Sequence, residues 1–175
     1  MEEIISRIGW EGGESFLGEK LNILALDLSS KPGYAYRVGK TISSGSIDLS
    51  RVKNEIPGLL YVRFNIWLTK LMNNHGGGAF KIVAVEKPFF RGGEATAIAI
   101  GLFTRVQEVV ALMDKPAELL IIQNRSLKKY ITGKGTATKE DMIRAAEKWI
   151  GQLVTDDDEA DALGILRWAI EKHGS

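Results

Sequence analysis

The sequence contains no cysteine and only two histidines. Without cysteine the chain cannot form disulfides, use a thiolate nucleophile or bind zinc through sulfur, and this composition suits a reducing compartment. His75 precedes a run of glycines and His173 lies next to the C-terminus, so both are expected to be solvated loop residues. We therefore expect neither histidine-based catalysis nor a zinc site.

Long hydrophobic runs are also missing. No segment reaches the roughly 18 apolar residues of a membrane-spanning helix, and residues 1–20 lack the basic and apolar regions of a secretory signal peptide. The chain has 175 residues, 45% of them hydrophobic and 26% charged, which is the composition of an ordinary soluble globular protein. We expect one domain over residues 21–175, no membrane association, and an extension of uncertain structure over residues 1–20.

Charge of one sign is not in excess, because the formal net charge is only +1. The two signs are nevertheless separated along the chain. Five cations and no acid lie between Arg125 and Lys139, and five acids and no base lie between Asp156 and Asp161. The first block suits a polyanionic partner and the second suits a metal ion, while the simpler interpretation of either block alone is a solvated face.

The spacing of apolar residues predicts the order of secondary-structure elements. Strands are expected over residues 22–28, 33–38, 40–49, 81–85 and 118–122. Helices are expected over residues 54–74, 94–113, 124–130, 138–150 and 155–171, with Asn124 or Ser126, Thr138 and Thr155 as the N-caps of the last three. The connections between the first three strands are too short for crossovers, so these strands are antiparallel. We therefore predict an α/β fold, in which a mixed five-stranded sheet of three antiparallel and then parallel strands carries helices on both faces.

Two of the predicted strands carry an acid where an acid is unfavourable. Asp27 interrupts the apolar run of the first strand, and Glu86 directly follows the strand over residues 81–85. A buried carboxylate is costly unless it is paired, hydrogen-bonded or bound to a metal. Taken alone, Asp27 is more simply interpreted as a residue that caps the turn after the strand.

The last predicted helix carries two further candidate ligands. Asp158 and Asp161 are three residues apart, so they lie on one helix face. The helix dipole and a near capping box explain the acids of the first turn, but they explain Asp161 poorly, because it is in line with the inward-facing Ile165 and Trp168. If these acids converge with those of the strands, mutual repulsion raises their pKa values unless a cation intervenes.

Oxygen ligands of this kind suit Mg²⁺ or Mn²⁺ rather than zinc. Two such ions about 4 Å apart form the clamp that is used for in-line phosphodiester hydrolysis. The pattern of acids therefore indicates a metal-dependent phosphodiesterase.

Four segments together resemble a known family. They are ILALDLSSKPGYA (23–35), VAVEKPFF (83–90), LKKYITGKGTATKEDM (127–142) and DEADAL (158–163). In this order and spacing they are similar to the RuvC-type Holliday junction resolvases of the ribonuclease H-like superfamily, over roughly residues 22–172. In place of the Asp-Pro-Gly that usually follows the family's first strand, this chain has Asp27-Leu28-Ser29-Ser30, so the family's cleavage-sequence preference is not carried over.

The resemblance implies a ribonuclease H-like nuclease domain over residues 21–175. It implies a homodimer that binds four-way DNA junctions and nicks two opposing strands symmetrically, in DNA recombination and repair. It also implies two Mg²⁺ or Mn²⁺ ions in each active site and a cytoplasmic protein of a bacterium or a phage. The family's metal-binding, catalytic acids fall on Asp27, Glu86, Asp158 and Asp161.

The same resemblance assigns a junction-probing aromatic to Phe89 and basic residues near the active site to Lys128 and Lys139. An aromatic in a glycine-bearing loop can stack on an unpaired base or wedge into a junction, although a strand-end aromatic can equally belong to the core. The TGKGT segment (132–136) lacks the spacing of a nucleotide-binding P-loop, but its glycines allow close approach to a phosphate; the alternative is a plain connection between helices. The expected DNA contacts are Phe89, Phe90, Arg91, Arg125, Lys128, Lys129, Lys134 and Lys139.

Two other classes of function remain open from the residues. A phosphotransferase of the actin or sugar-kinase type also begins with a strand acid followed by a turn that contains serine and glycine. The chain is short for that two-lobed form, and no adenosine site is evident. A non-catalytic branched-DNA-binding module is the second alternative, and only the loss of one of the four acids would favour it.

Overall fold

A computed structural model describes residues 21–50, 53–73, 80–89 and 92–173. Five strands form one sheet in the order β3-β2-β1-β4-β5. The strands are β1 (Ile23–Asp27), β2 (Gly33–Val38), β3 (Thr41–Ser46), β4 (Ile82–Glu86) and β5 (Glu118–Ile122). The helices are α1 (Leu59–Asn73), α2 (Gly93–Ala111), α3 (Asn124–Thr132), α4 (Lys139–Ile150) and α5 (Asp157–His173). The expected extension over residues 1–20 lies outside the described residues.

The strand directions are those predicted from the sequence. β1 pairs antiparallel with β2 and β2 with β3, whereas β1 pairs parallel with β4 and β4 with β5. Antiparallel strands can be joined by short turns, while parallel neighbours need a crossover, which α1 and α2 supply here. The mixed sheet is therefore confirmed.

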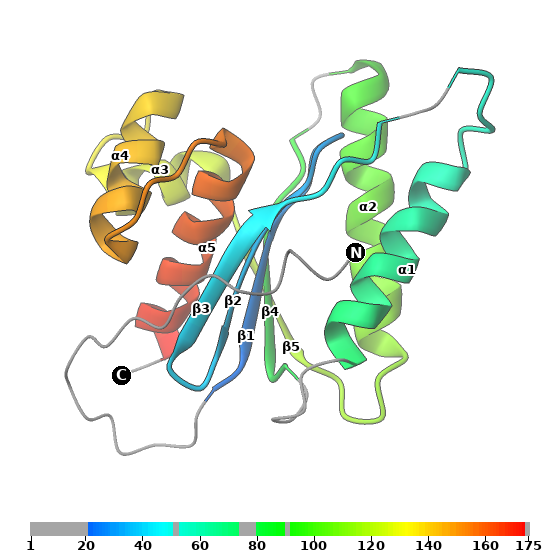
Figure 1. Ribbon diagram of the computed structural model, residues 1–175, viewed down its shortest axis with the longest axis horizontal. Coiled ribbons are helices and arrows are strands. Elements are labelled where there is room, and N and C mark those ends of the chain that lie inside the picture. The colour runs from blue at the N-terminus through cyan, green and yellow to red at the C-terminus, as the bar shows by residue number, and fades with distance from the viewer. Residues whose placement is uncertain (1–20, 51–52, 74–79, 90–91, 174–175) are drawn as a thin grey trace.

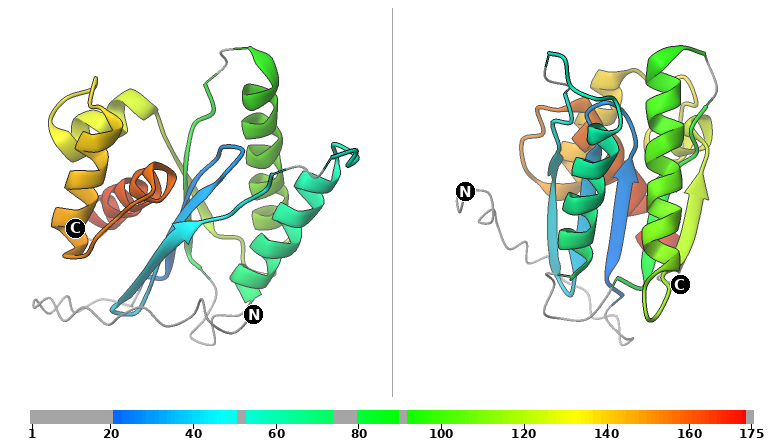
Figure 2. Two further views of the ribbon diagram at one scale, coloured as in Figure 1. Left: turned by 45° about the horizontal axis from the view of Figure 1, so that its top comes forward. Right: turned by 90° about the vertical axis from the view of Figure 1, so that its right-hand side faces the viewer.

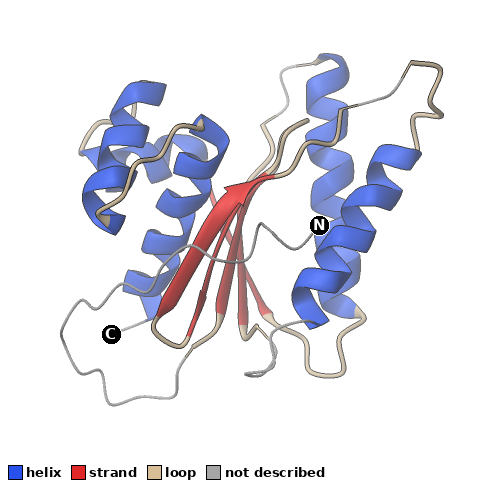
Figure 3. Ribbon diagram, in the orientation of Figure 1, coloured by secondary structure: helices blue, strands red, loops and turns tan. Residues whose placement is uncertain are grey.

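Helices cover both faces of the sheet, as predicted (Figures 1 and 3). Along β1, Ile23 and Ala25 pack in the core under α5, and the alternate residues Leu24 and Leu26 pack in the core under α1 and α2. This alternation is the period of two that a strand imposes on its side chains. Figure 2 shows from two further sides that α1 and α2 lie together on one face, with α3, α4 and α5 on the other. None of the described helices is long and apolar enough to span a membrane.

Several predicted helix starts are wrong by a few residues. α1 begins at Leu59 rather than at residue 54, and Ile56 is 71% exposed instead of packing in the core. The reason is Pro57, which disfavours helical geometry in the residue before it. The capping box of Thr138 and Asp141 at the start of α4 is confirmed, with the Asp141 N–H donating to the Thr138 hydroxyl at 3.2 Å.

The predicted caps of the other two helices are wrong. The residue before α3 is Gln123, so neither Asn124 nor Ser126 is its N-cap. At α5 the carboxylate of Asp156, not Thr155, accepts the N–H of Asp158 at 3.0 Å. Asp156 competes better because its carboxylate is charged and stands directly before the first helical residue.

The first turn of α5 lies directly on β2 at Gly33. Gly33 pairs with Asp27 across the sheet, and a Cβ atom on Gly33 would lie 1.9 Å from the carbonyl oxygen of Asp158. A side chain at this position would therefore collide with helix backbone. The missing side chain is what allows α5 to begin beside the end of β1.

We expect Gly33→Ala to lower the free energy of unfolding by about 1–3 kcal/mol, because the helix backbone must move to relieve the collision. Chemical denaturation measures this loss. The matched control is Gly58→Ala, where a Cβ meets no atom within 4 Å and stability should change by less than about 1 kcal/mol. Equal stability of the two variants would contradict the close approach.

Candidate active site

The acids of β1 and β4 lie on the same face of the sheet, at the ends of neighbouring strands. Leu26 and Val85 are the last pair in the parallel register, and Asp27 and Glu86 follow them directly. Ile82 and Ala84 alternate with Val83 in the same way as the β1 residues do, and they pack in the core under α5. Because successive side chains of a strand point to opposite faces, Asp27 and Glu86 both lie on the face covered by α5.

The first turns of α5 bring two more acids to this place. The pKa of Asp27 lies well above its ordinary value, first because of burial and then because of the negative charges of Glu86, Asp161 and Asp158. Burial, followed by the charge of Glu86, raises the pKa of Asp161 to about 7, against the opposing charge of Lys128. Charges act on one another in this way only when the side chains lie near one another. The four acids named from the sequence therefore converge.

Asp158 is held by the turn that follows β1. The Ser29 hydroxyl donates to Asp158 at 3.1 Å and accepts the N–H of Lys31 at 3.0 Å. Burial raises the pKa of Asp158, and the bond from Ser29 opposes this shift. The turn at Ser29 therefore supplies a hydrogen-bond donor to the acid cluster.

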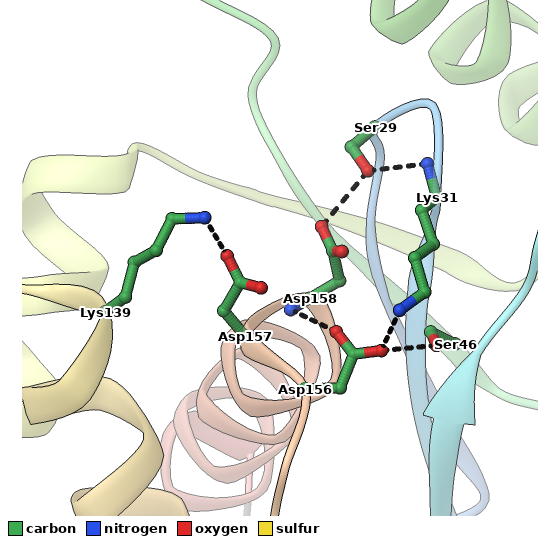
Figure 4. A network of polar contacts seen from close by, with 7 residues as sticks. All are labelled: Ser29, Lys31, Ser46, Lys139, Asp156, Asp157 and Asp158. Carbon is green, nitrogen blue, oxygen red and sulfur yellow. Dashed lines mark hydrogen bonds and ion pairs between the residues drawn. The ribbon is translucent and has the colours of Figure 1, made fainter.

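The neighbouring acids of α5 are neutralised by lysines (Figure 4). Lys31 forms an ion pair with Asp156, which also accepts from Ser46 at 2.7 Å, and Lys139 forms an ion pair with Asp157. The carboxylates of Asp156, Asp157 and Asp158 lie within 4.8 Å of one another and could together hold a cation. Two of these three carboxylates, those of Asp156 and Asp157, already face a lysine.

Glu86 has a partner that the sequence did not reveal. The side-chain amide of Asn124, the first residue of α3, donates to both carboxylate oxygens of Glu86 at 3.0 Å. The sequence predicts Asn124 only as a possible helix cap. The position of Asn124 follows from the strand register. Glu86 pairs with Ile122, which places the residues after β5 beside this acid.

A hollow of about 630 Å³ opens beside Asp27 and Glu86. Phe89, Asn124 and Arg125 are among the residues that line it, and Phe89 is 71% exposed. Phe89 therefore stands at the rim of the hollow rather than in the core.

The other residues expected to contact DNA differ in their surroundings. The positive charge of Lys128 opposes the rise in the pKa of Asp161, and Lys139 forms an ion pair with Asp157. Both lysines therefore lie at the acid cluster. Lys129 is exposed on α3, and Lys134 is exposed just beyond it. Phe90 and Arg91 lie outside the described residues.

The donor set fits a hard divalent cation. It consists of carboxylate oxygens, and burial followed by the negative charge of Glu86 raises the pKa of Asp27 and that of Asp161. Mg²⁺ and Mn²⁺ prefer such ligands, whereas zinc prefers nitrogen and sulfur. Asp27, Glu86, Asp158 and Asp161 therefore could hold a metal, as could the neighbouring group of Asp156, Asp157 and Asp158.

Comparisons with known proteins agree with the fold and with the resemblance to RuvC-type resolvases. No protein-family model matches the chain. The crossover junction endodeoxyribonuclease RuvC of Brachyspira hyodysenteriae is 26% identical over 140 residues, which are 76% of this chain and 82% of the relative. The predicted resemblance to RuvC-type resolvases is confirmed by this relative.

Two solved structures share the fold. Thermus thermophilus RuvC has a TM-score of 0.67 at 15% identity, and the match covers 88% of this chain and 97% of that chain. The same protein in complex with a Holliday junction substrate has a TM-score of 0.66 at 15% identity, covering 83% and 90%. The predicted ribonuclease H-like fold is confirmed by these matches.

The raised pKa of Asp161 predicts how stability depends on pH. Its value rises from 3.8 to about 7 on folding, so the folded protein binds more protons and the free energy of unfolding falls as the pH rises between these values. Without metal, Asp161→Asn should exceed the wild type at about pH 8 by on the order of 2 kcal/mol, after allowance for solvent screening. Near pH 4 the difference should vanish.

Urea denaturation in the presence of a chelator measures both variants across this range. Asp114→Asn, which changes an exposed acid between α2 and β5, is the control and should track the wild type. A stability difference between Asp161→Asn and wild type that stays constant with pH would contradict the raised pKa.

Proposed function

We propose that this RuvC-like chain is a metal-dependent endonuclease that resolves Holliday junctions. The curated relative and the junction-bound structural match support this activity. The observation that carries it is that the acids of β1 and β4 lie on one face of the sheet, where the start of α5 adds two more. Residues 21–175 form the nuclease domain in this proposal, which acts in the bacterial cytoplasm.

The four acids would bind Mg²⁺ or Mn²⁺, two ions in each site. Bound ions supply a hydroxide nucleophile at neutral pH and neutralise the charge that develops on the phosphate. The chain's own groups prepare the site for them. Ser29 orients Asp158, Asn124 orients Glu86, and Gly33 leaves the space in which α5 reaches Asp27.

DNA would approach the hollow beside these acids. Phe89 at its rim offers an exposed ring for stacking on an unpaired base. Basic side chains from β5 to the start of α4 would contact the backbone phosphates; they are Arg125, Lys128, Lys129, Lys134 and Lys139. Phe90 and Arg91, which follow Phe89 in the chain, are also proposed to contact DNA.

Symmetric nicking of two strands requires two active sites, and a homodimer supplies them. The outer face of α1 carries apolar side chains that a second copy could cover, since Leu59, Val62 and Ile66 are 43%, 49% and 52% exposed. Their spacing places them on one side of the helix. Ile100 of α2 is a further exposed apolar side chain, with 41% exposure.

The metal role is tested by nicking of a synthetic four-way junction in Mg²⁺ or Mn²⁺. Glu86→Gln keeps the shape of the side chain but removes its charge, so nicking should fall by more than about 100-fold while junction binding persists. Asp114→Asn should nick as the wild type does. Symmetric nicks by Glu86→Gln at the normal rate would contradict the assignment.

The dimer surface is tested by placing a charge on it. Ile66→Lys should dissociate the homodimer, because an ammonium group cannot be buried unpaired at the contact. Sedimentation velocity measures the change. The control is Ile121→Lys on β5, where a side chain of the same type is 46% exposed on another part of the molecule. If both variants remain dimeric, the contact lies elsewhere.

A further inference from the structure

Asn124 is fixed in place by the sheet that carries Glu86. Glu86 pairs with Ile122 in the parallel register, and the N–H of Lys87 donates to the carbonyl of Ile122 at 2.7 Å. Two residues after Ile122 the chain enters α3 with Asn124. The backbone hydrogen bonds between β4 and β5 therefore hold Glu86 and Asn124 close together.

The amide of Asn124 is used for Glu86 and not for the helix that it begins. Its nitrogen lies 3.0 Å from both carboxylate oxygens, and a carboxylate can only accept, so the amide orientation is defined. The residue in the N-cap position of α3 is Gln123, which makes no side-chain capping bond. The Asn124 side chain is half-buried and lines the hollow together with Asp27 and Glu86.

The amide that Asn124 offers to Glu86 is neutral, whereas the outer acids Asp156 and Asp157 face charged donors. Asp156 and Asp157 each face a lysine, which compensates their charge. An amide restrains a carboxylate without adding a positive charge of its own. A lysine in the same place would compete with the cation for Glu86.

We infer that Asn124 is a positioning residue, which holds Glu86 for metal binding through a neutral hydrogen bond. The inference rests on the proposed function, because it takes Glu86 as a metal ligand. Metal affinity would then depend on a residue outside the four acids.

Titration of the protein with Mn²⁺ alone, without DNA, tests the inference by calorimetry. Asn124→Leu has nearly the same size and no donor, and its dissociation constant for Mn²⁺ should rise about 10–100-fold. Asn124→Lys restores a donor but adds a positive charge, and it should weaken Mn²⁺ binding at least as much. Ser126→Ala, an exposed position on the same helix, should bind as the wild type does.

Melting curves in chelator establish that each variant is folded, and the rise in melting temperature on adding Mn²⁺ repeats the comparison. If Asn124→Leu melts without cooperativity, Asn124→Ser takes its place, and its affinity should also fall. Wild-type affinity in the donorless variant would overturn the positioning role. Wild-type affinity in Asn124→Lys would overturn the requirement for a neutral donor.

Glu86→Gln separates the failure of this inference from the failure of the proposed function. If Glu86→Gln abolishes Mn²⁺ binding and Asn124→Leu leaves it unchanged, only the role of Asn124 is wrong. If Glu86→Gln itself binds Mn²⁺ normally, the metal site proposed above is wrong, and the inference falls with it.

Discussion

The arrangement depends on repulsion among carboxylates that the fold forces together. Asp27 and Asp161 hold their protons more tightly than free aspartates do, because they are buried near other acids. The packing of the two hydrophobic cores, one on each face of the sheet, offsets the free-energy cost of this repulsion. A cation that binds only the folded state recovers the lost stability, so folding and metal binding favour each other.

The strands and the acids that they carry could be predicted from the sequence, because both depend on local patterns. The apolar runs around Asp27 and before Glu86 predicted two buried strands, and the period of two then determines the face on which each acid lies. Asp161 was recognised because it continues the inward stripe of α5 and is not needed by the helix dipole. The helix starts were less certain, because Pro57 and Asp156 act through single positions rather than through periodicity.

The supporting residues could not be predicted in this way. Ser29 contacts Asp158 across 129 positions of sequence, and Asn124 contacts Glu86 across 38. Such pairs follow only from the register of the strands and from the approach of α5 to Gly33. Serine and asparagine are also common in turns and at helix starts, so neither residue type stands out in the sequence.

The ion pair of Lys139 and Asp157 links the two proposed ligands, the divalent cation and DNA. Lys139 is proposed to contact DNA, and a phosphate that takes this ammonium group leaves Asp157 uncompensated beside the other acids. The electrostatic pull on a divalent cation then grows. Thermodynamic reciprocity requires the reverse as well: a protein already loaded with cations releases Lys139 more readily to nucleic acid.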